Sequence, residues 1–352
     1  MKKSSAAKID RTLPGREEMI ERVAALVPSL VERAEQVEKT RTIHPDTVQE
    51  LWDTQLWSVI KPKRYGGLEL DYGMMVDVPD YIARGCASTS WIYGNLVIHD
   101  WMLAMWPPQG QDAVWKDNPR ALMASSLVAN AGRATPATGG YIISGRWPYC
   151  SGIDISDWMM MAAMIQDDGP QRPIWLVVPR AEFEEIDTWH VSGLIGTGSR
   201  DVKCDEVFVP EFMTLEPRKT RGGPTPGTSH NPGLVYQLPA LGLFPHLLVG
   251  TTIGIAQGAY DDYVREIRDR VSTYNATKLA EHTQTQMKVA EAGALIQAAR
   301  LLTHDNIREA EVILESGRLP TIEEKVRWRR DGAFAAQNCV KSIQVLQSAI
   351  GA

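Results

Sequence analysis

The sequence predicts an α+β protein in which a small β region lies between two helical regions. Residues 15–115 carry apolar side chains three and four apart, residues 119–216 hold short β-rich segments between turns, and helical spacing returns over 241–352. Hydrophobic residues make up 44% and charged residues 23% of the 352, as in a folded globular chain. We therefore expect an N-terminal helical domain (1–118), a middle sheet or small β-barrel domain (119–216), a linker (217–240) and a C-terminal helical bundle (241–352).

Helical spacing dominates the N-terminal region. Apolar residues three and four apart over Glu17–Lys39 predict the first long helix, and Pro28 is expected to kink or split it. Two further helical stretches are expected near residues 72–84 and 88–106, where Pro107 and the proline after it end the second. A surface of packed helices should therefore precede the sheet.

The middle region consists of short β-rich segments separated by glycine and proline. Gly139-Gly140 and Asp168-Gly169-Pro170 are turn sequences between such segments. The spacing predicts a small antiparallel sheet or barrel. Its expected strands are Leu122–Leu127, Tyr141–Ser144, Trp158–Ile165, Ile174–Val178 and Val207–Val209.

Three helices are expected after the Pro- and Gly-rich linker. The first covers Leu247–Val271 and the second covers Ala276–Ser316. The third opens at Thr321-Ile322-Glu323-Glu324, a capping-box sequence, and reaches Ile350. Small residues along one face of the second helix predict close helix packing in a bundle.

Composition and motifs exclude several classes of function. The net charge is −6 without a basic block, which argues against nucleic acid as a partner. No apolar run reaches the ~20 residues that span a bilayer, so no membrane is expected. The four cysteines lie far apart without zinc-ligand spacing, which predicts no metal, reduced thiols and a cytoplasmic location. No GxGxxG, phosphate-loop, HExxH or GxSxG motif occurs, so reducing power must come from elsewhere.

Six strings carry a resemblance to a known family: Lys61–Leu68, Cys86–Gly94, His99–Pro107, Ser144–Gly152, Trp189–Ser199 and Val207–Glu211. In this order they resemble the acyl-CoA dehydrogenase fold, and more narrowly the flavin-dependent monooxygenase branch that supplies the oxygenase components of two-component aromatic hydroxylases. The resemblance covers nearly the whole chain. It also implies a last helix in a further stretch beyond Ala352, which this chain lacks.

The resemblance implies a reaction. Reduced FMN or FAD, with FMN the preferred of the two, would bind and react with O2 to form a C4a-hydroperoxyflavin. This intermediate would hydroxylate a small aromatic substrate of the phenol or indole type. A separate flavin reductase would supply the reduced flavin, and the bundle would assemble a homotetramer.

The resemblance also implies flavin contacts at Trp147, Tyr149, Cys150, Ser151, Gly152, Thr197, Ser199 and Arg270. The ring would lie along 147–151, in a dry crevice between the sheet and the late bundle, with Ser151 donating a hydrogen bond near flavin N5. Thr197 and Ser199 would reach the ribityl-phosphate, and Arg270 a flavin phosphate of the neighbouring subunit. Three plainer interpretations stay open: outward strand residues before an ordinary turn, a Gly-Thr-Gly turn between strands, and a solvated helix face.

Catalytic roles are implied for His99, Ser151 and Ser126, with Ser125 the less favoured neighbour. His99 would accept the proton of the substrate hydroxyl, because an imidazole titrates near neutral pH. The substrate pocket would consist of His99, Ser126, Trp158, Phe244 and His246. The alternatives are a core histidine with satisfied hydrogen bonds, and aromatic residues that belong to the core.

Three other functions compete with this one. An acyl-CoA dehydrogenase needs a carboxylate base beside the flavin, and the stretch 217–260, which holds one of the two places for it in the fold, has no Asp or Glu. An N- or S-oxygenating relative would share the oxygen activation. A helical scaffold or binding module would give only oxidation of free flavin when mixed with reduced flavin and O2.

Overall fold

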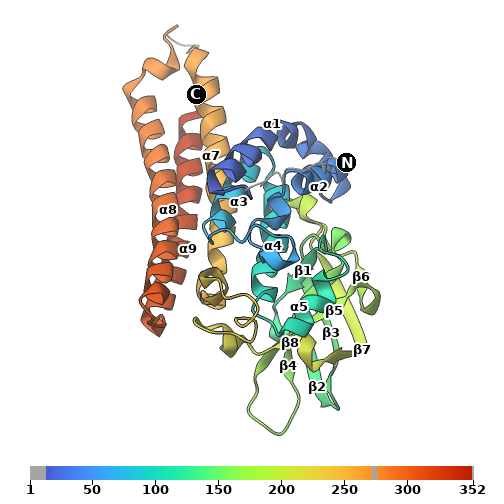
Figure 1. Ribbon diagram of the computed structural model, residues 1–352. Helices are drawn as coiled ribbons and strands as arrows, with labels where there is room; N and C mark the ends of the chain where they lie inside the picture. Colours follow the sequence, from blue (N-terminus) through green and yellow to red (C-terminus); the bar gives the residue numbers. More distant parts are fainter. Residues whose placement is uncertain (1–12, 272–275, 351–352) are drawn as a thin grey trace, which may run out of the picture.

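The computed structural model describes residues 13–271 and 276–350 and contains the predicted order of helices, sheet and helices (Figure 1). The sheet begins at Met123 and ends at Leu215, so the order of the three regions is confirmed, while boundaries at 118, 216 and 240 stay predictions. The N-terminal helices are α1 (Arg16–Thr40), α2 (Pro45–Asp53), α3 (Met74–Gly85), α4 (Ala87–Leu103) and α5 (Pro108–Trp115).

The first helix differs from the prediction at its proline. α1 runs through Pro28 without a break, so the split is not observed. Buried Met19 and Val23 before the proline and Leu30 and Val37 after it keep both halves packed on the core. Tertiary packing of an apolar face therefore outweighs the lost backbone hydrogen bond.

The strands are β1 (Met123–Ser126), β2 (Gly132–Ala137), β3 (Gly140–Cys150), β4 (Trp158–Ile165), β5 (Pro173–Pro179), β6 (Glu184–Ile186), β7 (Arg200–Pro210) and β8 (Thr214–Leu215). They form one sheet in the order β6-β7-β3-β2-β4-β5-β8, with β1 on β4. β1 and β2 pair in parallel with successive parts of one edge of β4, and the other pairs are antiparallel. The predicted antiparallel sheet is therefore mixed, because β4 shares this edge between two strands.

The C-terminal elements are α6 (Ala240–Leu243), α7 (Pro245–Asp269), α8 (Thr283–Glu315) and α9 (Ile322–Ile350). α8 begins seven residues later than predicted, after a short 3-10 turn at Leu279–Glu281. The predicted capping box is present: Thr321 N donates to Glu324 Oε2 at 2.7 Å, and Glu324 N donates to Thr321 Oγ1 at 3.2 Å.

α4 is the central element of the fold. It packs on α3 and α7 on one side and on β1 on the other. In Figure 1, α8 and α9 stand together on one side of the molecule and the sheet lies on the other, with α3, α4 and α7 between them. The 217–240 linker is tied to the end of α4, where Asn231 Nδ2 donates to Ala104 O at 2.9 Å.

One helical segment, Ala240–Asp269, is long and apolar enough by length and composition to cross a membrane. Its most apolar window is 61% buried inside the protein. The core helix of a soluble protein passes the same test, and α7 packs on α3, α4, α8 and α9. This burial explains the apolar composition.

Candidate functional site

The site is built on the face of α4 that meets the sheet. Ile92, Leu96 and His99 lie at positions i, i+4 and i+7, which places them on one helix face. The turn after β3 approaches this face so closely that a Cβ on Gly152 would lie 2.9 Å from Ile92 Cγ2. Gly152 also has a φ of +69°, where glycine is favoured. Ser151 is thereby held directly against α4.

Three predicted flavin-binding hydroxyls are brought together beside this turn. Ser151 Oγ lies 2.7 Å from Ser199 Oγ, which lies 2.7 Å from Thr197 Oγ1. Trp91 on α4 donates from Nε1 to Ser151 Oγ at 3.0 Å. All three hydroxyl-bearing residues are buried, and Gly152 N donates to Thr197 O at 3.0 Å. The turn after β3 and the loop before β7 therefore form one hydrogen-bonded unit.

His99 is fully buried and has one unused ring nitrogen. Its Nδ1 lies 2.8 Å from Met123 O, so Nδ1 carries the hydrogen and Nε2 is an acceptor. Burial lowers the pKa of His99 to about 4, against the smaller raising effect of this hydrogen bond. The ring is therefore neutral at pH 7, and Nε2 has no hydrogen-bond partner.

Ser126, at the end of β1, also has a buried polar atom without a partner. Its Oγ is buried and has no hydrogen-bond partner. Buried polar atoms are nearly always paired in native proteins, so two orphans at the α4–β1 interface call for a ligand. His99 is buried, as the core interpretation expects, but only one of its two ring nitrogens has a hydrogen-bond partner. The remaining acceptor and the serine hydroxyl suit a ligand that both donates and accepts, such as an aromatic hydroxyl.

The strand before Ser151 agrees with the outward interpretation at Tyr149 and not at Trp147, and its flavin contacts stay a prediction. Trp147 is fully buried, and its Nε1 donates to Ala162 O at 2.7 Å, so its side chain belongs to the sheet core and does not point outward. Tyr149 is 67% exposed with a φ of +64°, and its ring lies edge-on to Trp189. Cys150 is buried, and burial raises the pKa of its thiol, so it is an uncharged core residue. Only Tyr149 of these three presents its side chain to the surface.

His246 is turned away from α4. Its Nδ1 lies 3.2 Å from Leu243 O and its Nε2 lies 3.4 Å from Asn306 Nδ2 on α8. Burial lowers the pKa of His246 to about 4, with the hydrogen bond to Leu243 opposing it. The structure therefore places this ring in the helical bundle and not beside His99, because the next residue, Leu247, is the one that meets α4 at Gly94.

Three other predicted pocket and cofactor residues, Trp158, Phe244 and Arg270, lie at different distances from the Ser151 turn. Trp158 is half-buried and pairs in register with Met123, the residue that holds His99. Phe244 is partly buried where α7 begins. Arg270 caps the end of α7 that lies away from the sheet, and it pairs with Glu266 at 3.3 Å (Figure 1). Within one chain, Arg270 is therefore not part of the Ser151 cluster.

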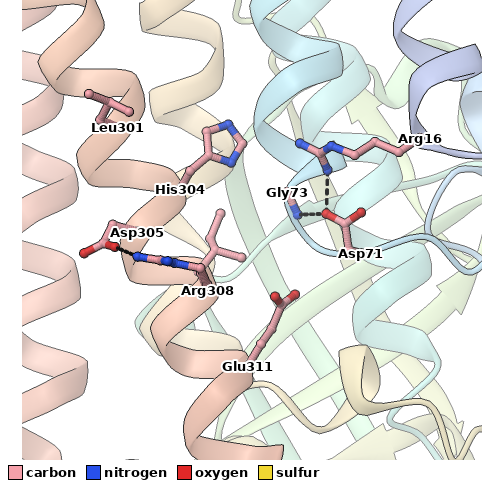
Figure 2. Close-up of a pocket in the computed structure, with 9 residues that line it drawn as sticks. Arg16, Asp71, Gly73, Leu301, His304, Asp305, Arg308 and Glu311 are labelled. Carbon is pink, nitrogen blue, oxygen red and sulfur yellow. Dashed lines mark hydrogen bonds and ion pairs between the residues drawn. The ribbon is translucent and has the colours of Figure 1, made fainter.

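Within one chain, α3, α4 and α7 lie between the sheet and the pair α8 and α9, and the predicted crevice between the sheet and the late bundle stays a prediction. A hollow of about 500 Å³ lies between α8, the start of α1 and the turn before α3 (Figure 2). Charged groups line it: Arg16 pairs with Asp71 at 2.5 Å, and Glu311 and Arg308 come from α8. None of the predicted flavin or substrate residues lines it.

Sequence reasoning missed one support of the site, Trp91, and one buried ion pair beside α4, Lys61 with Asp100. Trp91, which holds Ser151, lies inside a recognised string but had no role assigned. Lys61 is 1% exposed, with Nζ 3.4 Å from Asp100 Oδ2 and 2.8 Å from Pro119 O. Burial raises the pKa of Asp100 to about 6, and Lys61 opposes the rise. The sequence held one sign of this pair: Asp100 follows His99 within an apolar helix, and a carboxylate in such a place needs a positively charged partner.

Comparisons with known proteins identify the family to which the chain is similar. The chain matches the acyl-CoA dehydrogenase N-terminal domain over residues 14–115 and the acyl-CoA dehydrogenase C-terminal domain over residues 247–352. The oxygenase component of the FADH2-dependent resorcinol hydroxylase of Rhizobium sp. (strain MTP-10005) is 31% identical, over 95% of this chain and 84% of the relative.

Two solved structures are also similar. The HsaA monooxygenase from M. tuberculosis superposes with a TM-score of 0.91 at 28% identity, covering 96% of this chain and 89% of that one. XiaF from Streptomyces sp., in complex with FADH2 and glycerol, has a TM-score of 0.87 at 26% identity, covering 96% and 85%.

Proposed function

The chain belongs to the acyl-CoA dehydrogenase family, in its branch of flavin-dependent monooxygenase oxygenase components, and we propose that its substrate is a small aromatic compound of the phenol or indole type. The observation that carries the proposal is the pair of buried, unpartnered acceptor and hydroxyl groups, His99 Nε2 and Ser126 Oγ. A phenol hydroxyl donates to the first and accepts from the second. Within the described residues neither group has a hydrogen-bond partner, so both are available to such a ligand.

The chain's residues also fit a flavin. Bound reduced flavin supplies the electrons for oxygen activation, and the protein supplies orientation and a dry environment. Ser151 Oγ has one lone pair left after accepting from Trp91, so it can accept a hydrogen bond from a flavin N–H. His99, neutral at pH 7, can accept a hydrogen bond from the substrate hydroxyl at Nε2, and this bond raises the electron density of the aromatic ring.

The test compares His99→Asn with His246→Asn. Asparagine keeps a donor near the carbonyl that each Nδ1 contacts, and both histidines are buried with the same direction of pKa change. With reduced flavin, O2 and a panel of phenols and indoles, we expect His99→Asn to lower hydroxylated product about 100-fold while flavin binding is unchanged. Oxygen consumption then ends in H2O2. Product mass also separates ring hydroxylation from N- or S-oxygenation.

His246→Asn is the control and should keep product formation within a few-fold of the natural chain. Equal product yield from His99→Asn and the natural chain would remove the role of His99. If no compound in the panel gives product and free flavin is merely oxidised, the chain is a binding module and the proposed function fails.

We also propose FADH2 as the preferred flavin, in place of the FMN favoured by sequence. The support is the name of the resorcinol hydroxylase and the ligand of the XiaF structure, both of which specify FADH2. Parallel titrations with FADH2 and reduced FMN test this preference. The flavin would come from a separate reductase, since the sequence has no nicotinamide-binding motif. The four buried free cysteines support a cytoplasmic location.

A further inference from the structure

The hydroxyl cluster beside α4 has one hydrogen-bond direction that its two ends favour, called the resting direction below. Trp91 Nε1 is only a donor, so Ser151 Oγ accepts from it. At the other end, Thr197 Oγ1 donates to Leu194 O at 2.9 Å, and a carbonyl is only an acceptor. Thr197 therefore accepts from Ser199, and Ser199 in turn accepts from Ser151. Every hydroxyl hydrogen is used within the chain of bonds.

A reversed direction is also compatible with these contacts. Thr197 then donates to Ser199, Ser199 donates to Ser151, and the hydrogen of Ser151 is free for a ligand. Leu194 O loses one donor but keeps two others, Trp189 Nε1 at 3.1 Å and Thr197 N at 3.1 Å. The reversal therefore leaves no buried carbonyl orphaned and costs only the Thr197–Leu194 side-chain bond.

The two directions present opposite surfaces to a ligand atom beside Ser151. In the resting direction the Ser151 oxygen offers a lone pair, which suits a donor. In the reversed direction Ser151 offers its hydrogen, which suits an acceptor. Flavin N5 changes character in this way: it carries a hydrogen in the reduced flavin and a bare lone pair in the oxidised flavin.

We propose that the Trp91–Ser151–Ser199–Thr197 relay makes the site select reduced over oxidised flavin, with Thr197 and Ser199 as positioning residues that act through Ser151. This inference rests on the proposed function. Reduced flavin is accepted by the resting relay, whereas oxidised flavin must reverse three hydroxyls and lose the bond to Leu194 O. The hydroxyls of Thr197 and Ser199 are thus assigned to Ser151 and not to the ribityl-phosphate.

Thr197→Val tests the relay because it removes one hydroxyl and keeps the shape. Ser199 then has Ser151 as its remaining partner in the relay, donates to it and releases the Ser151 hydrogen. We expect oxidised FAD to bind more tightly and reduced FAD more weakly, so that the ratio of the two Kd values moves about fivefold toward the oxidised form. This ratio corresponds to a fall of about 20 mV in the potential of the bound flavin. Anaerobic titrations of both forms measure it.

Thr214→Val is the matched control. Thr214 is buried, and its Oγ1 donates to Glu211 O, three residues earlier, at 2.8 Å, as Thr197 does to Leu194 O. The control should keep the natural ratio. Ser199→Ala should shift the ratio in the same direction as Thr197→Val, and it serves if the valine variant does not fold.

Urea unfolding without flavin gives a second measurement. The Thr197→Val and Ser199→Ala losses of stability should be non-additive, since the two residues share a bond, whereas Thr214→Val with Ser199→Ala should be additive. An unchanged Kd ratio in Thr197→Val, or equal weakening of both flavin forms, overturns the inference while the proposed function stands. Failure of the natural chain to bind either form of FAD or FMN overturns the proposed function itself.

Discussion

At the scale of single residues, the buried histidines link the site to the stability of the protein. His99 and His246 have pKa values lowered to about 4 by burial, from an ordinary value of 6.5. Each is uncharged in the folded protein and takes up a proton in the unfolded chain when the pH falls below 6.5. The free energy of unfolding therefore decreases as the pH falls from 6.5 to 4, by about 1.4 kcal/mol per pH unit for each histidine.

The His99→Asn variant isolates one of these contributions. Above pH 6.5 its stability should run parallel to that of the natural chain. Between pH 6.5 and 4 the natural chain should lose stability more steeply, by up to about 1.4 kcal/mol per unit. Asp100, whose pKa is raised to about 6, gains stability as pH falls but is present in both proteins and cancels. If the free energies of unfolding of the two proteins change in parallel from above pH 6.5 down to pH 4, His99 is not a neutral buried group in the folded protein.

A second residue-scale prediction concerns the packing beneath the Ser151 turn. A Cβ on Gly132 would lie 1.9 Å from Trp147 Cζ2, and the bond from Trp147 Nε1 to Ala162 O keeps the indole from moving. Gly132→Ala should therefore lower the free energy of unfolding by about 3 kcal/mol. Gly193→Ala, at a position with nothing within 4 Å, is the control and should be nearly neutral. Thermal denaturation of the two variants makes the comparison.

At the scale of elements, the capping box at the start of α9 gives a separable prediction. Thr321→Ala removes the acceptor for Glu324 N and should cost about 1 kcal/mol of stability. Thr321→Ser keeps the hydroxyl and should lower the free energy of unfolding by only a few tenths of a kcal/mol. Equal losses in urea denaturation of the two variants would mean that the threonine methyl group, and not the cap, stabilises the helix.

The elements that could be predicted were those whose sequence carries a continuous apolar pattern. β4 has the predicted limits, Trp158–Ile165, because its apolar run is buried on both sides. β2, β6 and β8 were missed, since β2 has no run of large apolar residues and β6 and β8 have only three and two residues. The 3-10 turn before α8 was also missed, because its residues keep helical spacing. Local pattern therefore identified the elements with large buried faces.

The candidate site was predictable only as separate strings. Ser151 and Ser199 are 48 residues apart, and Trp91 and Ser151 are 60 apart, so no local pattern brings the three together. Their contact depends on Gly152, which allows the turn to approach Ile92 and Leu96 on α4. The buried orphan atoms of His99 and Ser126 likewise became visible only when α4 was packed against β1.

At the scale of the whole molecule, the two long helices α8 and α9 leave several apolar side chains exposed. Met287, Leu301 and Val312 lie on one face of α8 and are 67%, 60% and 55% exposed. On α9, Ile322 and Val326 are 73% and 59% exposed. α8 stands at the outer side of the molecule (Figure 1). Aligned exposed apolar residues are typical of a protein interface, and we propose that these faces join the subunits of the homotetramer that the resemblance implies.

Charged substitutions test this assembly directly. Leu301→Glu and Val326→Glu would each place a carboxylate in the proposed interface once in every subunit, and burying an unpaired charge is strongly unfavourable. We expect both variants to sediment as smaller species than the natural chain, while circular dichroism shows unchanged helix content. Phe208→Glu, on β7 and 47% exposed, is the control because it lies on the sheet, away from α8 and α9. If both bundle variants keep the natural sedimentation coefficient, these faces do not join subunits, and the homotetramer would have to form through another surface.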